Sequence, residues 1–299
     1  MELVKRVLTA VVLIPLVLIL VLRAPVAVLA LVAGAAALLA IRELLKLAEW
    51  YNIHAFYVPT YIYCALIFIA IAVFPGVTDM LSTAGFAYFA VAAAVIAPFL
   101  FLALAMRASE LTSGFPAAMV SAFAVVYVAL PMASLVQMRE QWRGAFFLLY
   151  LLLLVWAGDI FAYLIGKAFG RHRMSPRVSP KKTWEGAAAS VVASVAVGIA
   201  MFNNAPAVSS ALMRFHLIEQ KDGIFTSPAS LVPTIVLSII LNVAAQFGDL
   251  VESLIKRGAG IKDSGAILPG HGGMLDRIDA LLFAAPVLWC YMAWRVMMQ

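Results

Sequence analysis

The sequence is dominated by apolar runs about as long as a bilayer is thick, separated by short polar segments. We count nine such runs, near residues 7–22, 25–46, 57–75, 83–105, 116–138, 145–168, 184–203, 228–257 and 275–297. A helix needs about 20 apolar residues to cross the hydrocarbon core, and in lipid only helices and closed barrels satisfy all backbone polar groups. The sequence therefore predicts an all-α, polytopic integral membrane bundle of about nine transmembrane helices.

The composition separates this chain from soluble domains. Of its 299 residues, 65% are hydrophobic and 12% are charged, whereas soluble chains carry about 25% charged residues. The net charge of +6 is typical of a membrane protein that gathers lysine and arginine in its cytosolic loops, so we expect no nucleic-acid partner. The two cysteines, Cys64 and Cys290, lie far apart in apolar runs and indicate neither a disulfide framework nor a zinc motif.

The lysines and arginines predict the orientation of the chain. With nine alternating spans, fifteen of the 21 basic residues fall on the side of the N-terminus and six on the other. This bias places the N-terminus and two basic loops, 167–184 and 257–275, in the cytosol. The first run shows no cleavage site and is expected to be retained. We therefore expect a multi-pass protein of the cytoplasmic (inner) membrane, with scaffold helices over residues 1–143 and a catalytic half over residues 144–299.

Charged residues are concentrated near the C-terminus, between residues 242 and 279. Five of the fifteen acidic residues fall here, namely Asp249, Glu252, Asp263, Asp276 and Asp279, together with Lys256, Arg257, Lys262 and Arg277. A carboxylate at the mouth of a membrane helix is costly to desolvate and indicates a functional site. If residues 238–257 form one helix, polar side chains at steps of three and four share one face. They are Ser238, Asn242, Gln246, Asp249, Ser253 and Lys256.

Two pairs of acids flank a loop rich in glycine and basic residues. Asp249 and Glu252 precede the loop, and Asp276 and Asp279 follow it, one helical step apart. The glycines allow backbone N–H groups to contact phosphate oxygens, and Mg²⁺ prefers a few carboxylates together with substrate phosphates. The stretch predicts a site for a divalent cation and a polyphosphate at the cytosolic membrane face.

The order and spacing of these residues resemble the phosphatidate cytidylyltransferase (CDP-diacylglycerol synthase) family. The matching residues are Ser253-x-x-Lys256-Arg257, Lys262-Asp263, Leu268-Pro269-x-His271-Gly272-Gly273 and Asp276-Arg277-x-Asp279. The stretch from Ser179 to Gly186, which contains Lys181 and Lys182, also resembles the family. A dozen fixed residues at fixed spacing form a far more specific pattern than a lone glycine motif.

The resemblance implies an integral-membrane enzyme of phospholipid biosynthesis that converts CTP and phosphatidic acid to CDP-diacylglycerol and pyrophosphate. It also implies a divalent metal, usually Mg²⁺. We assign Asp249, Asp276 and Asp279 as its ligands and expect the active site to face the cytosol. The residues expected to act in catalysis are Asp249, Asp276, Asp279, Lys256 and Arg257. The residues expected to bind substrate are Lys181, Lys182, Ser253, Lys262, Asp263, His271, Gly272, Gly273 and Arg277.

Other interpretations stay open at this point. Asp276 and Asp279 also suit the start of a helix dipole, and Asp249 could pair with Gln246 or Lys256. A direct or an orienting role is open for Asp159, Glu252 and His271, as are a second cation and a homodimer. A CTP-dependent polyprenol or lipid kinase would need a similar site, and a transporter could line an ion path with Asp159 and Asp249.

Two further expectations concern the rest of the chain. Glu43 lies near the end of the second apolar run and is expected to pair with Arg42 or Lys46. The segment 204–227 is expected to be an external loop without chemistry.

Overall fold

The computed structural model describes residues 2–73, 80–108, 110–220, 223–227, 230–265 and 272–297. Its helices are α1 (Glu2–Arg23), α2 (Val26–Glu49), α3 (Tyr57–Val73), α4 (Met80–Ala105), α5 (Leu111–Ala124), the π-helical turn η2 (Val125–Ala129), α6 (Leu130–Glu140), α7 (Gly144–Phe169), α8 (Trp184–Asn203), α9 (Ala205–Arg214), α10 (Leu231–Gly258) and α11 (Leu275–Met297). A hairpin of β1 (Arg173–Ser175) and β2 (Ser179–Thr183) joins α7 to α8. The predicted all-α class is confirmed.

Seven helices in the described part of the chain are long and apolar enough to cross a membrane. The α5–η2–α6 segment acts as one of them, since it runs without a break from Leu111 to Glu140. Two further predicted spans correspond to shorter apolar helices, Leu13–Arg23 and Tyr57–Val73. The protein is therefore a multi-pass helical bundle, while the count of nine spans and the placement of the termini stay predictions.

Two short elements were not expected from the sequence. The segment 204–227 contains α9, a helix with Pro206 in its first turn, where proline is favoured, and with Ala205, Ser209 and Leu212 buried on one side. The basic loop 167–184 contains the β1–β2 hairpin, in which Arg173 faces Thr183 and Ser175 faces Ser179. The hairpin is too short for a periodic pattern to show in the sequence. The helix α9 buries Ala205, Ser209 and Leu212 at helical spacing, so the expectation of a loop throughout 204–227 was wrong.

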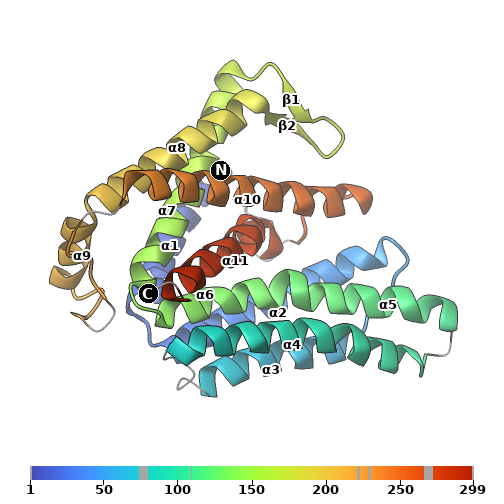
Figure 1. The fold of residues 1–299 in the computed structure, drawn as a ribbon. Helices are drawn as coiled ribbons and strands as arrows, with labels where there is room; N and C mark the ends of the chain where they lie inside the picture. Colours follow the sequence, from blue (N-terminus) through green and yellow to red (C-terminus); the bar gives the residue numbers. More distant parts are fainter. Residues whose placement is uncertain are drawn as a thin grey trace.

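Two hydrophobic cores hold the bundle together, and α11 belongs to both. One core joins α2 to α6, and the other joins α7, α8, α10 and the C-terminal end of α6. Leu275, Ile278 and Leu282 of α11 lie in the first core, whereas Ala284 and Leu288 lie in the second. Accordingly, α10 and α11 lie between the α7–α8 pair and the layer of α2 to α6 (Figure 1). The division of the chain near residue 143 stays a prediction.

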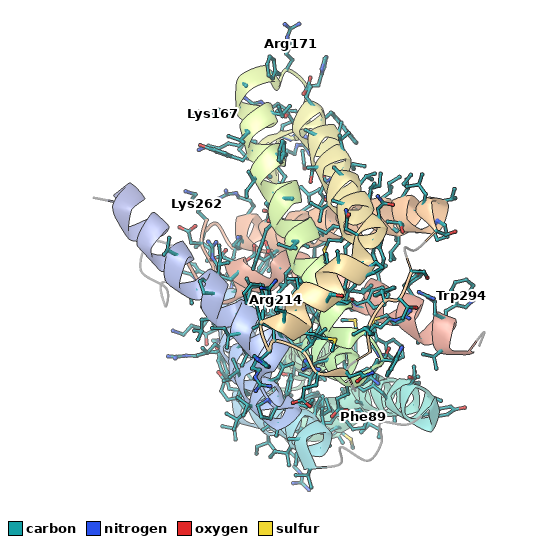
Figure 2. The ribbon with its side chains drawn as sticks, turned by 90° about the vertical axis from the view of Figure 1, so that its left-hand side faces the viewer. Phe89, Lys167, Arg171, Arg214, Lys262 and Trp294 are labelled. Atoms are coloured by element: carbon teal, nitrogen blue, oxygen red, sulfur yellow. The ribbon has the colours of Figure 1, made fainter. Side chains whose placement is uncertain are left out.

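This arrangement gathers the predicted site residues at one end of the bundle. The end of α7, the start of α8 with its hairpin, the end of α10 and the start of α11 all belong to that end. Lys167 and Arg171 lie there, well away from Trp294 near the end of α11 (Figure 2). Close helix packing makes this possible: a Cβ on Gly158 of α7 would lie 2.7 Å from Asn242 Nδ2 and 2.8 Å from Ser190 Oγ.

Candidate functional site

Three residues of the polar stripe of α10, Ser238, Asn242 and Gln246, pack against α7 and α8 and therefore share a face. Their side chains all find partners there, and Asn242 is buried. The hydrogen bonds are Tyr150 Oη with Ser238 Oγ (2.8 Å), Asn242 Nδ2 to Ser190 Oγ (2.8 Å) and to Ser194 Oγ (2.8 Å), and Gln246 Nε2 to the carbonyl of Ala187 (3.3 Å). Because buried polar groups are costly unless they are paired, the stripe fixes the rotation of α10 and so the direction in which Asp249 points.

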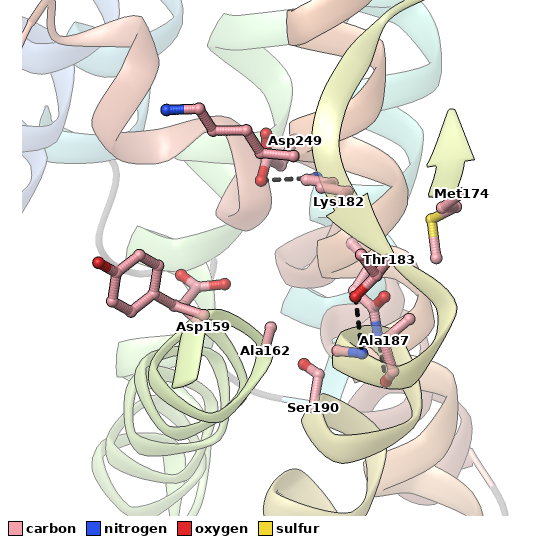
Figure 3. A pocket seen from close by; sticks show the side chains of 12 residues that line it. Asp159, Ala162, Met174, Lys182, Thr183, Ala187, Ser190 and Asp249 are labelled. Atoms are coloured by element: carbon pink, nitrogen blue, oxygen red, sulfur yellow. Dashed lines mark hydrogen bonds and ion pairs between the residues drawn. The ribbon is translucent and has the colours of Figure 1, made fainter. Parts of the chain in front are cut away.

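Asp249 forms an ion pair with Lys182 at the mouth of a cleft. Lys182 Nζ lies 2.7 Å from Asp249 Oδ2, and the two side chains are 27% and 39% exposed. The cleft has a volume of about 280 Å³ and is also lined by Asp159, Tyr163 and Lys181 (Figure 3). The alternative in which Asp249 pairs with Gln246 or Lys256 is wrong, because Lys182 of β2 is its cation. The pair remains open to a solute, since neither side chain is buried.

A second ionic group lies further along α10 and joins Glu252 and Lys256 of that helix to Asp276 of α11. Lys256 forms an ion pair with Glu252 and donates to Asp276 Oδ1 at 2.5 Å. Asp276 Oδ2 accepts the backbone N–H of Ser264 (3.0 Å), the hydroxyl of Ser264 (3.0 Å) and the backbone N–H of Gly273 (2.8 Å). A carboxylate has about four acceptor positions, so Asp276 is saturated here. It ties the loop after α10 to the start of α11.

The structure adds Glu43 to the site, a residue whose role sequence reasoning misjudged. Its buried carboxylate accepts the backbone N–H groups of Met274 (2.9 Å) and Leu275 (2.8 Å) and the hydroxyl of Ser264 (2.9 Å). The first N–H groups of a helix lack acceptors within the helix. At the start of α11, the carboxylate of Glu43 is the acceptor. The expected pairing with Arg42 or Lys46 is therefore wrong.

Gly273 makes this arrangement possible. A Cβ at this position would lie 2.2 Å from Ser264 Oγ and 2.3 Å from Glu43 Oε2, so only glycine lets both groups approach the loop. The backbone N–H of Gly273 donates to Asp276 and is therefore not available to a phosphate group. The only sequence signal for Glu43 was a carboxylate within an apolar run, which by itself indicates a functional role.

Asp279 lies between the two ionic groups. It is half-buried on α11 and within electrostatic reach of Asp249, Asp159 and Lys256. The backbones are close as well, because a Cβ on Gly248 of α10 would lie 2.4 Å from the carbonyl oxygen of Asp279. Acids from α7, α10 and α11 therefore lie within electrostatic reach of one another.

The donor set at this region is of the kind that a hard divalent cation prefers. Carboxylate oxygens dominate it, and Glu252 Oε1 is buried with no hydrogen-bond partner among the described residues. Within the same part of the chain, no three His, Cys, Asp or Glu side chains converge closely enough to hold an ion jointly. The residues fit Mg²⁺ by chemistry, and the assignment of Asp249, Asp276 and Asp279 as its ligands stays a prediction.

The other residues expected to bind substrate lie around these groups. Arg257 donates to the carbonyls of Val178 (3.4 Å) and Ile261 (3.2 Å), so it links α10 to the hairpin and to the loop. Ser253 donates to Asp249 Oδ1 at 3.4 Å. The exposed residues are Lys181, Lys262, Asp263 and Arg277, and Gly272 has a positive φ of 77°. His271 lies outside the described residues. Their binding roles stay predictions.

Fold and site together define a class: a multi-pass helical membrane protein whose lysines and carboxylates meet in an open cleft at the helix ends. The chain belongs to the Cytidylyltransferase family, whose model matches residues 4–294. It is 36% identical over 148 residues to the phosphatidate cytidylyltransferase of Haemophilus influenzae, covering 50% of this chain and 46% of the relative. It is 36% identical over 164 residues to the phosphatidate cytidylyltransferase of Staphylococcus saprophyticus, covering 55% of each.

A plant protein is similar over a somewhat shorter stretch of the chain. The chain is 40% identical over 135 residues to phosphatidate cytidylyltransferase 5, chloroplastic, of Arabidopsis thaliana, covering 45% of this chain and 29% of the relative. The matched segments thus span about half the length of the curated bacterial relatives.

Proposed function

We propose that this protein is a phosphatidate cytidylyltransferase, which converts CTP and phosphatidic acid to CDP-diacylglycerol and pyrophosphate. Membership of the Cytidylyltransferase family and the names of the relatives support the reaction. The observation that carries the proposal is the cleft in which Lys182 meets Asp249 beside Lys181 and Asp159. A cleft that offers both cations and carboxylates suits a polyphosphate and its metal.

The chemistry requires charge neutralisation more than proton transfer. A phosphate oxygen of phosphatidate forms a bond to the α-phosphorus of CTP, and the bond from that phosphorus to the departing pyrophosphate breaks. The attacking phosphomonoester has a second pKa of about 6 and is already largely dianionic at neutral pH, so no general base is needed. Lys181 and Lys182 would bind the nucleotide or the lipid headgroup, and catalysis would rest on positioning and electrostatic stabilisation.

Mg²⁺ would be held by the carboxylates that approach one another from α10 and α11. Asp249 and Asp279 are open to this role, and Asp276 could join them only by giving up the ammonium group of Lys256. When bound, the cation would neutralise negative charge on the phosphates of the nucleotide. Lys256, freed in that exchange, would join Arg257, Lys262 and Arg277 as a cationic contact for the triphosphate. A second cation that shares the same acids is a further part of the proposal.

The location of the site suits one water-soluble and one lipid substrate. Asp276 and Asp279 lie in the first two turns of α11 and Asp249 lies in the second half of α10, and both helices are long enough to span a membrane. CTP would arrive from the cytosol while phosphatidate stays in the bilayer, so we place the active site at the cytosolic face of the inner membrane. The excess of lysine and arginine on that side supports this orientation.

The position of a radiolabel tests the reaction. Purified protein is incubated with phosphatidate and CTP labelled either at the α-phosphate or at the γ-phosphate, with Mg²⁺. We expect the α-label, and not the γ-label, to enter the lipid. Entry of the γ-label alone would show a lipid kinase instead, and entry of neither label would overturn the proposal.

A further inference from the structure

A second cavity lies at the end of the bundle opposite the candidate active site. It is formed by the start of α7, the end of α8, the start of α10, the end of α11 and residues of the 223–227 segment, and it has a volume of about 340 Å³. The active-site cleft is lined by the other ends of three of these helices, α7, α8 and α10, together with the β1–β2 hairpin. Arg143 and Arg295 line the second cavity together with Phe202, Phe225, Tyr291 and Trp294.

Two side-chain contacts hold Arg143 in place. Its Nε donates to the carbonyl of Ile224 at 3.1 Å, and its guanidinium carbon lies 4.1 Å from the centroid of the Phe225 ring. Its backbone adopts a left-handed conformation with φ of 64°, which is strained for a residue other than glycine. The next residue, Gly144, packs so tightly that a Cβ there would lie 1.9 Å from the carbonyl oxygen of Met138. The structure thus stabilises an unfavourable backbone that presents this guanidinium at the cavity.

In the part of the chain that the structure describes, no carboxylate forms an ion pair with Arg143 or Arg295, and the terminal nitrogens of both side chains have no hydrogen-bond acceptor. Both side chains are half-buried. Burial of Arg143 and the nearby positive charge of Arg295 both lower the pKa of Arg143. The two guanidinium groups are therefore close enough to repel one another. A guanidinium has five donors, and most of those at this cavity have no acceptor among the residues that the structure describes.

The walls of the cavity suit a ligand that is ionic at one end and apolar at the other. Ser227 and Ser230 add hydroxyl groups beside the arginines, and Trp294 is 53% exposed. Tryptophan and tyrosine favour the level of the lipid headgroups. Guanidinium groups form strong, paired hydrogen bonds with phosphate oxygens.

We propose that Arg143 and Arg295 form a second binding site, distinct from the active site, for a phosphate group. The source of that phosphate is either an anionic phospholipid such as phosphatidylglycerol or free inorganic phosphate. Because this site lies away from the active-site cleft, the proposal is independent of the proposed catalytic activity.

Arg295 carries the test, because substitution of Arg143 would also disturb its backbone contacts. Full-length protein and the variants Arg295→Gln, Arg295→Lys and Arg214→Gln are purified in neutral detergent. Arg214 is the matched control, since it is an exposed arginine in the last turn of α9. Binding of phosphatidylglycerol and of phosphatidylcholine is titrated by native mass spectrometry, with and without millimolar inorganic phosphate.

We expect the unmodified protein and Arg214→Gln to bind phosphatidylglycerol more tightly than phosphatidylcholine. Arg295→Gln should bind phosphatidylglycerol about tenfold more weakly, which is the loss expected for one charge-assisted hydrogen bond, and Arg295→Lys should recover part of the affinity. If inorganic phosphate displaces the lipid, the site accepts free phosphate; if it does not, the site requires the lipid. The proposal would be overturned if Arg295→Gln and the unmodified protein bound phosphatidylglycerol with equal affinity and responded equally to inorganic phosphate.

Discussion

Glu43 on α2 accepts the backbone N–H of Met274, at the start of α11, across a distance of 2.9 Å and 231 positions of the chain. The helix that carries Asp276 and Asp279 therefore depends on a carboxylate from the N-terminal half. Removal of this carboxylate should disturb the active site without touching any group proposed to contact a substrate.

We expect Glu43→Gln to lower the free energy of unfolding by about 1–3 kcal/mol, because an amide nitrogen would face donors that are left unsatisfied. CDP-diacylglycerol formation should fall with it, since Asp276 and the Ser264 loop lose their support. Thermal unfolding in detergent and initial rates measure the two effects. Lys46→Gln is the matched control, because Lys46 is exposed on the same helix. A Glu43→Gln protein as stable and active as the control would contradict the role of Glu43.

The Lys182–Asp249 pair should matter for activity and little for stability. Both side chains are partly exposed, and pairs of this kind contribute about 1 kcal/mol or less. We therefore expect a double-mutant cycle of Lys182→Gln and Asp249→Asn, measured by thermal unfolding, to give a small coupling free energy. Each single variant should lose about 100-fold in kcat/KM, the loss typical of removing one charge-stabilising group. Arg171→Gln, at an exposed position before the hairpin, serves as the charge control. Large instability with intact activity would assign the pair a structural role.

Asp276→Asn tests whether this residue binds the metal or only the loop. Asparagine leaves one acceptor oxygen where the aspartate accepts from Lys256, Ser264 and Gly273, so we expect a lower melting temperature in either case. If Asp276 is also a metal ligand, turnover should be nearly abolished and the Mg²⁺ concentration for half-maximal activity should rise at least tenfold. An unchanged Mg²⁺ requirement, together with a lower melting temperature, would show that Asp276 acts only on the loop.

Removal of divalent cations should stop the reaction. Treatment of the purified protein with EDTA should reduce CDP-diacylglycerol formation to background, because uncompensated phosphate charge would repel Asp249 and Asp279. Addition of Mg²⁺ should restore the rate, and the melting temperature should change little in the absence of substrate. Full activity in EDTA would rule out the proposed metal.

The sequence predicts those features that depend on local pattern. Apolar runs of sufficient length identify the helices, because hydropathy and length are properties of the segment itself. The spacing of Asn242, Gln246 and Asp249 shows that they share a face of α10, because helical geometry alone sets that face. The choice of partner could not be predicted in this way. Lys182 meets Asp249 only because a short hairpin with no periodic signal turns β2 back towards α10.

The role of Glu43 escaped prediction for a related physical reason. Its nearest cations in the sequence are Arg42 and Lys46, and a local ion pair is a reasonable expectation on a helix. In the structure both cations are exposed, while Glu43 is 3% exposed and faces the start of another helix. A tertiary contact between segments more than 200 residues apart leaves no periodic trace in a single sequence.

The buried hydrogen bonds of α10 also bear on the order in which the chain is made. Tyr150, Ser190 and Ser194, the partners of Ser238 and Asn242, belong to helices that leave the ribosome before α10 does. A newly made α10 with an unpaired Asn242 would enter lipid at a cost, but its partners are already in the membrane when it arrives. Insertion of α10 and its docking on α7 and α8 are therefore expected to be coupled during synthesis.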